Sequence, residues 1–253
     1  MRIGLCASAG QAAAAKAAGC DYIELNFTTV ARMDDETFEE TKAALQAANL
    51  PCEAMNCFIP GDFNLYALED GAALAAYMRA GMVRAVELGV DVIVFGSAGA
   101  RKLPVGVDKA EGLRKLLPWF QMAGELAAEA GLTVVIEPLN TREDNAVNTL
   151  REGIALMQQV NLPGLRVLAD MYHMGENGED LSDPALAGAE LRHCHIARPA
   201  GRKYPLPGDG YDYTQFFAAL RQIGYAGRLS IEASPVNGPA DLPLCVEYLR
   251  SLA

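Results

Sequence analysis

Short apolar runs alternate with longer amphipathic stretches along the whole chain. Apolar runs of five or six residues, bounded by glycine or polar residues, predict buried β-strands. We expect eight strands, at residues 2–6, 21–25, 52–56, 91–95, 132–137, 165–170, 191–196 and 228–232. The stretches between them repeat apolar residues at helical spacing, which predicts helices, for example at residues 35–49, 72–88 and 108–130.

The order of these elements predicts a parallel sheet, because a helix follows each strand before the next one begins. Several predicted helices end in a glycine that suits a left-handed cap, as at Ala130-Gly131. An open doubly wound sheet would usually carry a GxGxxG turn after its first strand, and residues 6–10 lack that pattern. We therefore predict an α/β fold, a single (β/α)8 TIM barrel, with residues 1–253 as one domain.

The composition favours a folded cytoplasmic protein that acts on a small molecule. Apolar residues make up 51% of the chain, enough to bury a sizeable core. The net charge of −11 argues against a nucleic-acid partner, which would require a basic surface. The six cysteines form no CxxC pair, so we expect reduced thiols. The sequence leaves the oligomeric state open and is compatible with a homo-oligomer.

No segment predicts a membrane-spanning helix, because the apolar runs fall short of the ~18 residues that such a helix needs. The N-terminal segment superficially resembles a secretory signal, since Arg2 precedes small apolar residues. Ser8, Gln11 and Lys16 interrupt that apolar stretch. We interpret the segment as the first strand followed by an alanine-rich helix.

Each of the last four predicted strands ends in a residue that can bind a metal: Glu137, Asp170, His195 and Glu232. A parallel barrel brings the carboxyl ends of its strands to one mouth, so these side chains are expected to meet. A single carboxylate at a strand end is often only a helix cap or a surface charge, but four successive strands are harder to explain by capping. We predict one divalent metal, with Mn²⁺ favoured over Mg²⁺, Co²⁺ or Zn²⁺.

Strand pleating distinguishes His195 from its neighbours. Alternate side chains of a barrel strand point inward, so His193 lies on the same face as His195 and one layer deeper, while Cys194 faces the helices. We expect His193 to be an interior histidine with its hydrogen bonds satisfied, and Cys194 to pack in the core.

The motifs around these positions resemble those of the xylose-isomerase-like sugar isomerase/epimerase superfamily. They are Glu137-Pro-Leu-Asn140 followed by Glu143, Asp170-Met-Tyr-His173, His195, and Ser-Ile-Glu232. The pattern is most similar to that of the ketose 3-epimerases and hydroxypyruvate isomerases, in which Glu, Asp, His and Glu on strands five to eight hold the metal. The resemblance spans nearly the whole chain. It implies an enediolate mechanism, with Glu137 and Glu232 moving protons on opposite sides of a carbohydrate substrate.

The resemblance also implies substrate contacts. Glu143 and His173 match residues that bind substrate hydroxyls in similar epimerases, although each can also be a solvent-facing polar residue. The epimerases place an arginine shortly after the histidine ligand, and either Arg198 or Arg202 can fill that position. These arginines also suit a phosphate or carboxylate on the substrate, or simply a solvated lid loop.

Three weaker candidates come from the residues alone. Arg101 follows a small-residue segment after the fourth predicted strand and could clamp an anion. Glu24 and Asn56 close the second and third predicted strands and could hydrogen-bond a polyol, although Glu24 could instead cap the next segment. Loops 58–70 and 199–213 are long and rich in glycine, proline and aromatic residues, which predicts lids over the mouth or packed-down loops.

These observations lead to three functional hypotheses. The first is a metal-dependent isomerase or epimerase of a ketose, sugar phosphate or hydroxy-carbonyl acid. The second is a lyase or dehydratase on the same scaffold, such as an inosose dehydratase or an enzyme that cleaves 3-keto-glycosides, because enolisation is the shared first step. The third is a DNA-repair endonuclease or a barrel that only binds ligand. The three histidines and the acidic charge disfavour the endonuclease.

Overall fold

The computed structural model describes all 253 residues and forms a closed barrel of eight parallel strands in sequence order. The strands are β1 (Arg2–Cys6), β2 (Tyr22–Asn26), β3 (Cys52–Asn56), β4 (Val92–Phe95), β5 (Thr133–Ile136), β6 (Leu165–Asp170), β7 (Leu191–Ile196) and β8 (Arg228–Ile231). β8 pairs with β1, which closes the sheet. The predicted (β/α)8 barrel is confirmed, and each strand lies within one residue of its expected bounds.

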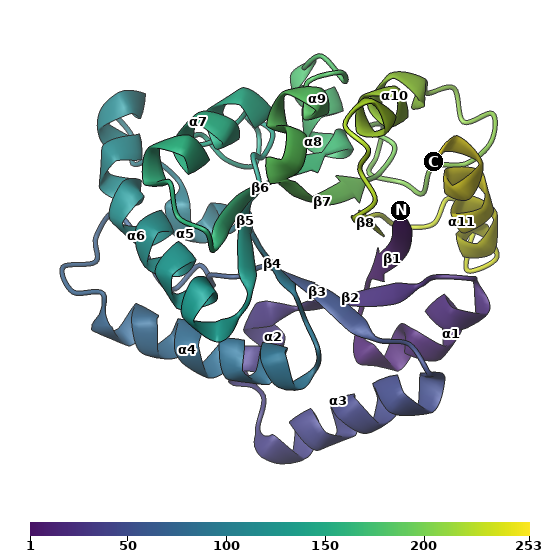
Figure 1. The fold of residues 1–253 in the computed structure, drawn as a ribbon, viewed down its shortest axis with the longest axis horizontal. Coiled ribbons are helices and arrows are strands. Elements are labelled where there is room, and N and C mark those ends of the chain that lie inside the picture. Colours follow the sequence, from purple (N-terminus) through teal and green to yellow (C-terminus); the bar gives the residue numbers. More distant parts are fainter.

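Helices surround the barrel (Figure 1). They are α1 (Ala12–Ala17), α2 (Phe27–Arg32), α3 (Asp35–Ala48), α4 (Ala72–Glu87), α5 (Ala98–Arg101), α6 (Lys109–Ala130), α7 (Leu150–Val160), α8 (Met171–Asn177), α9 (Pro184–Ala187), α10 (Thr214–Gln222) and α11 (Asp241–Leu252), with 3₁₀ turns at Ala9–Gln11 and Gly188–Glu190. The long helices α3, α4 and α6 match the sequence prediction. The short helices α2 and α8 directly follow β2 and β6, and α5 follows β4 after two intervening residues; all three are too short to show a helical period.

A small apolar core fills the inside of the barrel. It comprises Tyr22, Ala54, Val92, Val94, Val135 and Leu168. Gly4 on β1 pairs in register with Tyr22 on β2, and a Cβ atom at Gly4 would lie 2.3 Å from the Tyr22 ring. The glycine therefore makes room for a phenol ring inside the barrel, below the mouth.

Ion pairs tie the strands together at the amino-terminal end of the barrel. The Arg228 Nε atom lies 2.7 Å from a Glu53 oxygen, and Arg2 pairs with the same carboxylate. Arg228 also pairs with Asp91, which directly precedes β4. Charges that join β1, β3, β4 and β8 at this end leave the carboxyl-terminal mouth free for other side chains.

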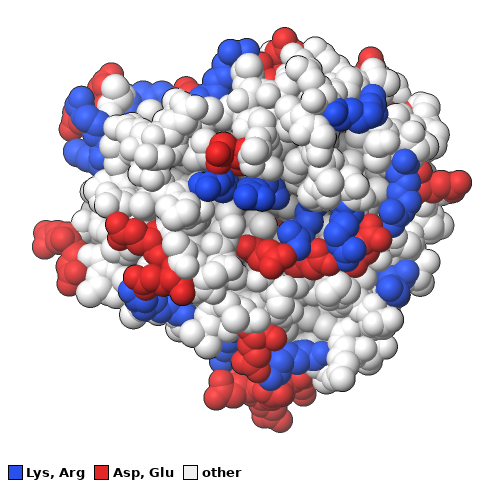
Figure 2. All heavy atoms as spheres, viewed as in Figure 1, with Lys and Arg blue, Asp and Glu red and all other residues white.

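Two long loops follow β3 and β7, where the sequence predicted lids. Phe58 in the first loop is fully buried and packs edge-on against Phe27 and Phe95, with ring centroids 4.9 and 5.7 Å apart. This part of the loop is therefore packed onto the barrel. On the outer surface shown in Figure 2, acidic and basic side chains are interspersed. None of the helices has the length and apolar character needed to cross a bilayer.

The packing at Gly4 predicts that Gly4→Ala is destabilising. Its new methyl group would overlap the Tyr22 ring, and overpacking of this kind costs roughly 1–3 kcal/mol. Gly10→Ala is the matched control, because the nearest atom to a Cβ there is 3.8 Å away. Urea unfolding should show a lower midpoint for Gly4→Ala only. Equal midpoints for the two variants would contradict this account of the barrel interior.

Candidate active site

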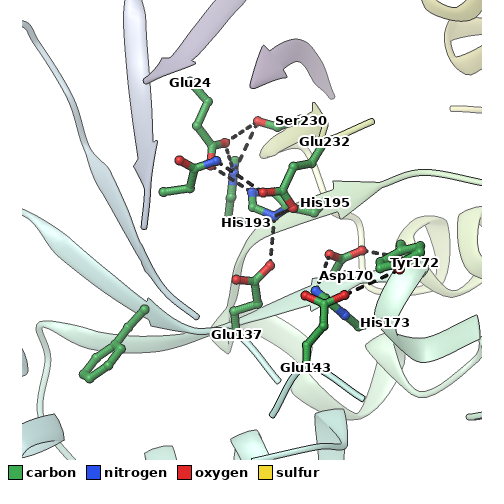
Figure 3. A network of polar contacts seen from close by, with 12 residues as sticks. Glu24, Glu137, Glu143, Asp170, Tyr172, His173, His193, His195, Ser230 and Glu232 are labelled. Atoms are coloured by element: carbon green, nitrogen blue, oxygen red, sulfur yellow. Dashed lines mark hydrogen bonds and ion pairs between the residues drawn. The ribbon is translucent and has the colours of Figure 1, made fainter. Parts of the chain in front are cut away.

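The four predicted metal ligands meet at the carboxyl-terminal mouth. Glu137 and Glu232 directly follow β5 and β8, Asp170 ends β6, and His195 lies near the end of β7. Each offers one ligand atom, and these four atoms all lie within 4.8 Å of one another. Figure 3 shows these side chains converging on one space from separate strands.

The imidazole of His195 lies at the centre of this group and is completely buried. Its Nδ1 atom is 3.0 Å from Glu137 Oε1 and 3.2 Å from Glu232 Oε2. Its Nε2 atom is on the other side of the ring, 2.9 Å from Glu24 Oε1. The Nδ1 edge of His195 therefore faces the carboxylates that are expected to share a metal.

The neighbouring strand makes room for Glu137. A Cβ atom on Gly96, the residue after β4, would lie 2.1 Å from Glu137 Oε2. The main chain at Glu137 is held by Arg101, whose Nη2 donates to the Glu137 carbonyl at 2.7 Å. The glycine after β4 thus leaves space for the Glu137 side chain, and the buried arginine at the end of α5 holds its backbone.

The same contacts change the interpretation of Arg101. Its side chain is 0% exposed, and its donors are directed at Asp144, the Phe95 carbonyl and the Glu137 carbonyl. Each of the three guanidinium nitrogens donates within the protein, and the side chain is not exposed to the mouth. In the structure Arg101 therefore holds the backbone at Glu137, whereas the sequence predicted a contact with a substrate anion.

The donor set fits a divalent cation. Asp170 Oδ1 accepts from the backbone N–H of Tyr172 at 2.7 Å, whereas Asp170 Oδ2 is buried without a hydrogen-bond partner. A buried carboxylate oxygen that forms no hydrogen bond is costly unless a cation is there to pair with it. Three carboxylates and one imidazole form the kind of site that Mn²⁺, Mg²⁺ or Zn²⁺ occupies.

The electrostatics of the two glutamates differ. Burial raises the pKa of Glu137. Burial also acts to raise the pKa of Glu232, but the charges of His195 and Arg202 outweigh it and lower this pKa to about 2. Arg202 also pairs directly with Glu232. Glu232 is therefore the glutamate held in its ionised form, while Glu137 is the one that gains a proton more easily.

His173, Glu143 and Arg202 form a second polar group beside the four ligands. His173 is buried, and its Nδ1 accepts from the Asn140 backbone N–H at 3.1 Å while its Nε2 lies 3.4 Å from Asp170 Oδ2. Burial lowers the pKa of His173, so it is a neutral hydrogen-bonding group. The side chains of Glu143 and Arg202 are 38% and 30% exposed, with Arg202 Nη1 3.7 Å from Glu143 Oε2. This group forms one wall of the mouth.

Sequence reasoning missed two residues of this wall. The amide of Asn140 donates to Glu143 at 2.9 Å, and the Tyr172 ring lies 4.5 Å below the Arg202 guanidinium. Both belong to the motifs that carried the family resemblance, EPLN and DMYH, so their position next to the predicted ligands was the available signal.

Of the other predicted contacts, Asn56 and Arg202 lie next to the predicted ligands at the mouth, whereas Arg198 and Glu24 are directed elsewhere. Asn56 is at the mouth, where its amide nitrogen lies 3.3 Å from Glu232 Oε1. Arg198 is on the β7–α10 loop and directs Nε at the Ala200 carbonyl, so Arg202 is the arginine that the structure brings to the ligands. Glu24 is 0% exposed with both oxygens hydrogen-bonded to histidines, and it therefore lies behind His195 instead of presenting a free carboxylate to a polyol.

A cavity of 720 Å³ opens beside Glu232. Near the ligands it is lined by Asn56, Arg202 and Glu232. Away from them it extends past the small residues 7–10 to α2 and α3, where Val30, Met33, Thr37 and Thr41 line it. The charged lining residues are confined to the end of the cavity next to the predicted ligands, so the remote end suits an uncharged group.

A family model described as xylose isomerase-like TIM barrel matches residues 12–252. The chain belongs to this family. Among curated relatives, it is 37% identical over 146 residues to a ketose 3-epimerase of Arthrobacter globiformis, an alignment covering 56% of this chain and 50% of the relative. It is 27% identical over 203 residues to a 3-dehydro-D-guloside 4-epimerase of Escherichia coli, covering 77% and 76%. The chain thus spans about half the length of the first of these relatives.

Solved structures share the xylose isomerase-like fold over the full chain. A crystal structure of D-psicose 3-epimerase, determined in the presence of D-fructose, superimposes with a TM-score of 0.86 and 20% identity, covering 100% of this chain and 99% of the other. At this level of identity the superposition supports the fold alone.

The protonation of His195 predicts how metal binding depends on pH. Burial acts to lower the pKa of His195, but the surrounding carboxylates, Glu24 first, raise it well above its ordinary value. A metal requires the deprotonated Nδ1, so it must compete with a proton over a pH range above the usual histidine pKa of about 6.5. Mn²⁺ affinity should therefore rise with pH and binding should release protons, as measured by calorimetry in buffers of different ionisation enthalpy. Affinity that falls or stays constant from pH 6.5 to 8 would contradict this prediction.

Proposed function

We propose that this protein is a divalent-metal-dependent epimerase or isomerase that acts on a keto sugar through an enediolate. The observation that carries the proposal is the convergence of Glu137, Asp170, His195 and Glu232, together with the buried Asp170 Oδ2 atom that forms no hydrogen bond. The family match and the ketose 3-epimerase relatives support the same class of reaction. We propose Mn²⁺ as the preferred ion and the cytoplasm as the location.

The four ligands would hold the ion, which when bound supplies positive charge that stabilises an enediolate. The two glutamates supply the proton transfers. Glu232, held ionised by His195 and Arg202, takes a proton from a carbon next to the substrate carbonyl. Glu137, with its raised pKa, returns a proton from the other side. Because an epimerase acts on both epimers, each glutamate performs the opposite role in the reverse reaction.

The neighbouring polar group would orient the sugar. His173 is fixed as a neutral ring by Asn140, and it can bind a hydroxyl without adding charge to the site. Arg202 and Glu143 can bind further hydroxyls at the more exposed side of the mouth. Asn56 lies next to Glu232, where it can hold an oxygen close to the carbon that loses its proton. These contacts place the substrate between the two glutamates.

The cavity favours a neutral substrate with an additional group, such as a keto sugar carried in a glycoside. Small-molecule sites commonly measure about 300–1,000 Å³, and 720 Å³ is ample for more than one sugar ring. Its remote end is lined by Val30, Met33, Thr37 and Thr41, which do not provide positive charge for a phosphate. The relative named as a 3-dehydro-D-guloside 4-epimerase aligns over most of both chains, in agreement with this substrate class.

The test is proton exchange with solvent. The purified protein is incubated in D₂O with Mn²⁺, or with EDTA, and with free ketoses, sugar phosphates, inososes or 3-keto-glycosides, and NMR records deuterium at carbon. We expect metal-dependent uptake together with an epimeric or isomeric product, and preference for a neutral glycoside. Uptake with loss of a group would identify a lyase instead. Bound Mn²⁺ without uptake from any substrate class would overturn the proposal.

Glu137→Gln and Glu232→Gln are each expected to lower kcat at least ~10²-fold, because a glutamine amide cannot carry the proton. Glu129→Gln is the matched control, since Glu129 is exposed and pairs with Arg79 on the outer surface. Circular dichroism should show a folded protein in all three variants. Near-wild-type turnover in both active-site variants would rule out this pair as the acid and base.

A further inference from the structure

Glu24 is a completely buried carboxylate that the proposed reaction does not use. It lies on β2, on the opposite side of His195 from Glu137 (Figure 3). Its Oε1 is 2.9 Å from His195 Nε2, and its Oε2 is 2.7 Å from His193 Nε2 and 2.5 Å from Ser230 Oγ. These short contacts compensate the cost of burying the Glu24 carboxylate in the barrel interior.

The hydrogen positions in this network follow from counting donors. An ionised carboxylate only accepts, so Ser230 and both histidines must donate to Glu24. The single hydroxyl hydrogen of Ser230 is then used, and Tyr22, whose OH is 2.7 Å from Ser230 Oγ, must donate to Ser230. Three hydrogens are therefore donated to Glu24, and the fourth, from Tyr22, is donated to Ser230.

The state of His193 agrees with this direction. Its Nδ1 atom is buried without a hydrogen-bond partner, so the prediction that its hydrogen bonds are satisfied holds for Nε2 but is wrong for Nδ1. If the ring hydrogen is on Nε2 and is donated to Glu24, the Nδ1 atom carries only a lone pair and buries no unpaired hydrogen. The other tautomer would bury an Nδ1–H without an acceptor, which is the rarer and more costly arrangement.

We infer that Glu24 is the positioning residue that fixes His195 as its Nε2–H tautomer, so that the Nδ1 lone pair is presented to the metal. This inference rests on the proposed metal site. Histidine ligands commonly donate their other N–H to a carboxylate, which orients the ring and makes the coordinating nitrogen more basic. Here one carboxylate does so while also anchoring His193, Ser230 and, through Ser230, Tyr22. The inner layer of the barrel is thus connected to the ligand above it.

Glu24→Gln tests the inference, because the amide keeps the shape of the side chain but loses the charge and can donate to a ring nitrogen. Loss of a carboxylate behind a metal-binding histidine typically costs about 10–100-fold in metal affinity. We expect that loss for Mn²⁺ in isothermal titration calorimetry at pH 8. Ser230→Ala is the matched control, since it removes a different donor to Glu24 and leaves the His195 contact in place; its Mn²⁺ affinity should stay within about threefold of wild type.

A second measurement uses the wild-type protein and so does not depend on how a variant folds. The chain has three histidines, and long-range ¹H–¹⁵N spectra of the Zn²⁺-loaded protein can therefore assign each ring. We expect the His195 hydrogen on Nε2 with Nδ1 as the coordinating atom, and the His193 hydrogen also on Nε2. A His195 hydrogen on Nδ1, or Glu24→Gln binding Mn²⁺ within twofold of wild type, would overturn the inference alone. Wild-type protein that binds no Mn²⁺ would overturn the proposed function and the inference with it.

Discussion

The structure depends on the burial of several carboxylates around one imidazole at the mouth of the barrel. Glu24, Glu137, Asp170 and Glu232 all approach His195 or each other, and His195 itself is fully buried. Charges of one sign at such distances repel strongly in a medium of low dielectric, so they persist only when cations or donors offset them. His195, Arg202 and the proposed metal provide that compensation at the mouth. The hydrogen-bond donors below Glu24 provide it in the barrel interior.

The surrounding fold holds these groups in place against that repulsion. Gly96 gives the Glu137 side chain its space, and Arg101 holds the Glu137 carbonyl while paired with the buried Asp144. Gly4 admits the Tyr22 ring, from which the hydrogen-bond chain to Glu24 begins. None of these residues is a proposed ligand or acid–base group; each supports a residue of the site or of the network behind it. Their combined effect is a site whose geometry is set before any ligand arrives.

Much of the fold and the four proposed ligands could be predicted from sequence, because both follow from the length of the strands and the alternation of their side chains. Strand length and pleating locate Glu137, Asp170, His195 and Glu232 at strand ends, and barrel closure brings strand ends together. The role of Glu24 could not be predicted, because it depends on the packing of β2 side chains against β7 across the barrel interior. The burial of Arg101 could not be predicted, because α5 is a single short turn and leaves no periodic signal in the sequence. The choice of Arg202 over Arg198 depends on the path of an irregular loop.

The ion pairs at the amino-terminal end of the barrel have a consequence for evolution. Arg2, Glu53, Asp91 and Arg228 join strands at the end of the barrel remote from the mouth. Stability that is anchored there does not depend on the exposed residues of the loops after β3 and β7. Those exposed residues, unlike the buried Phe58, are therefore free to diverge, so the substrate preference of the mouth can change while the barrel stays stable.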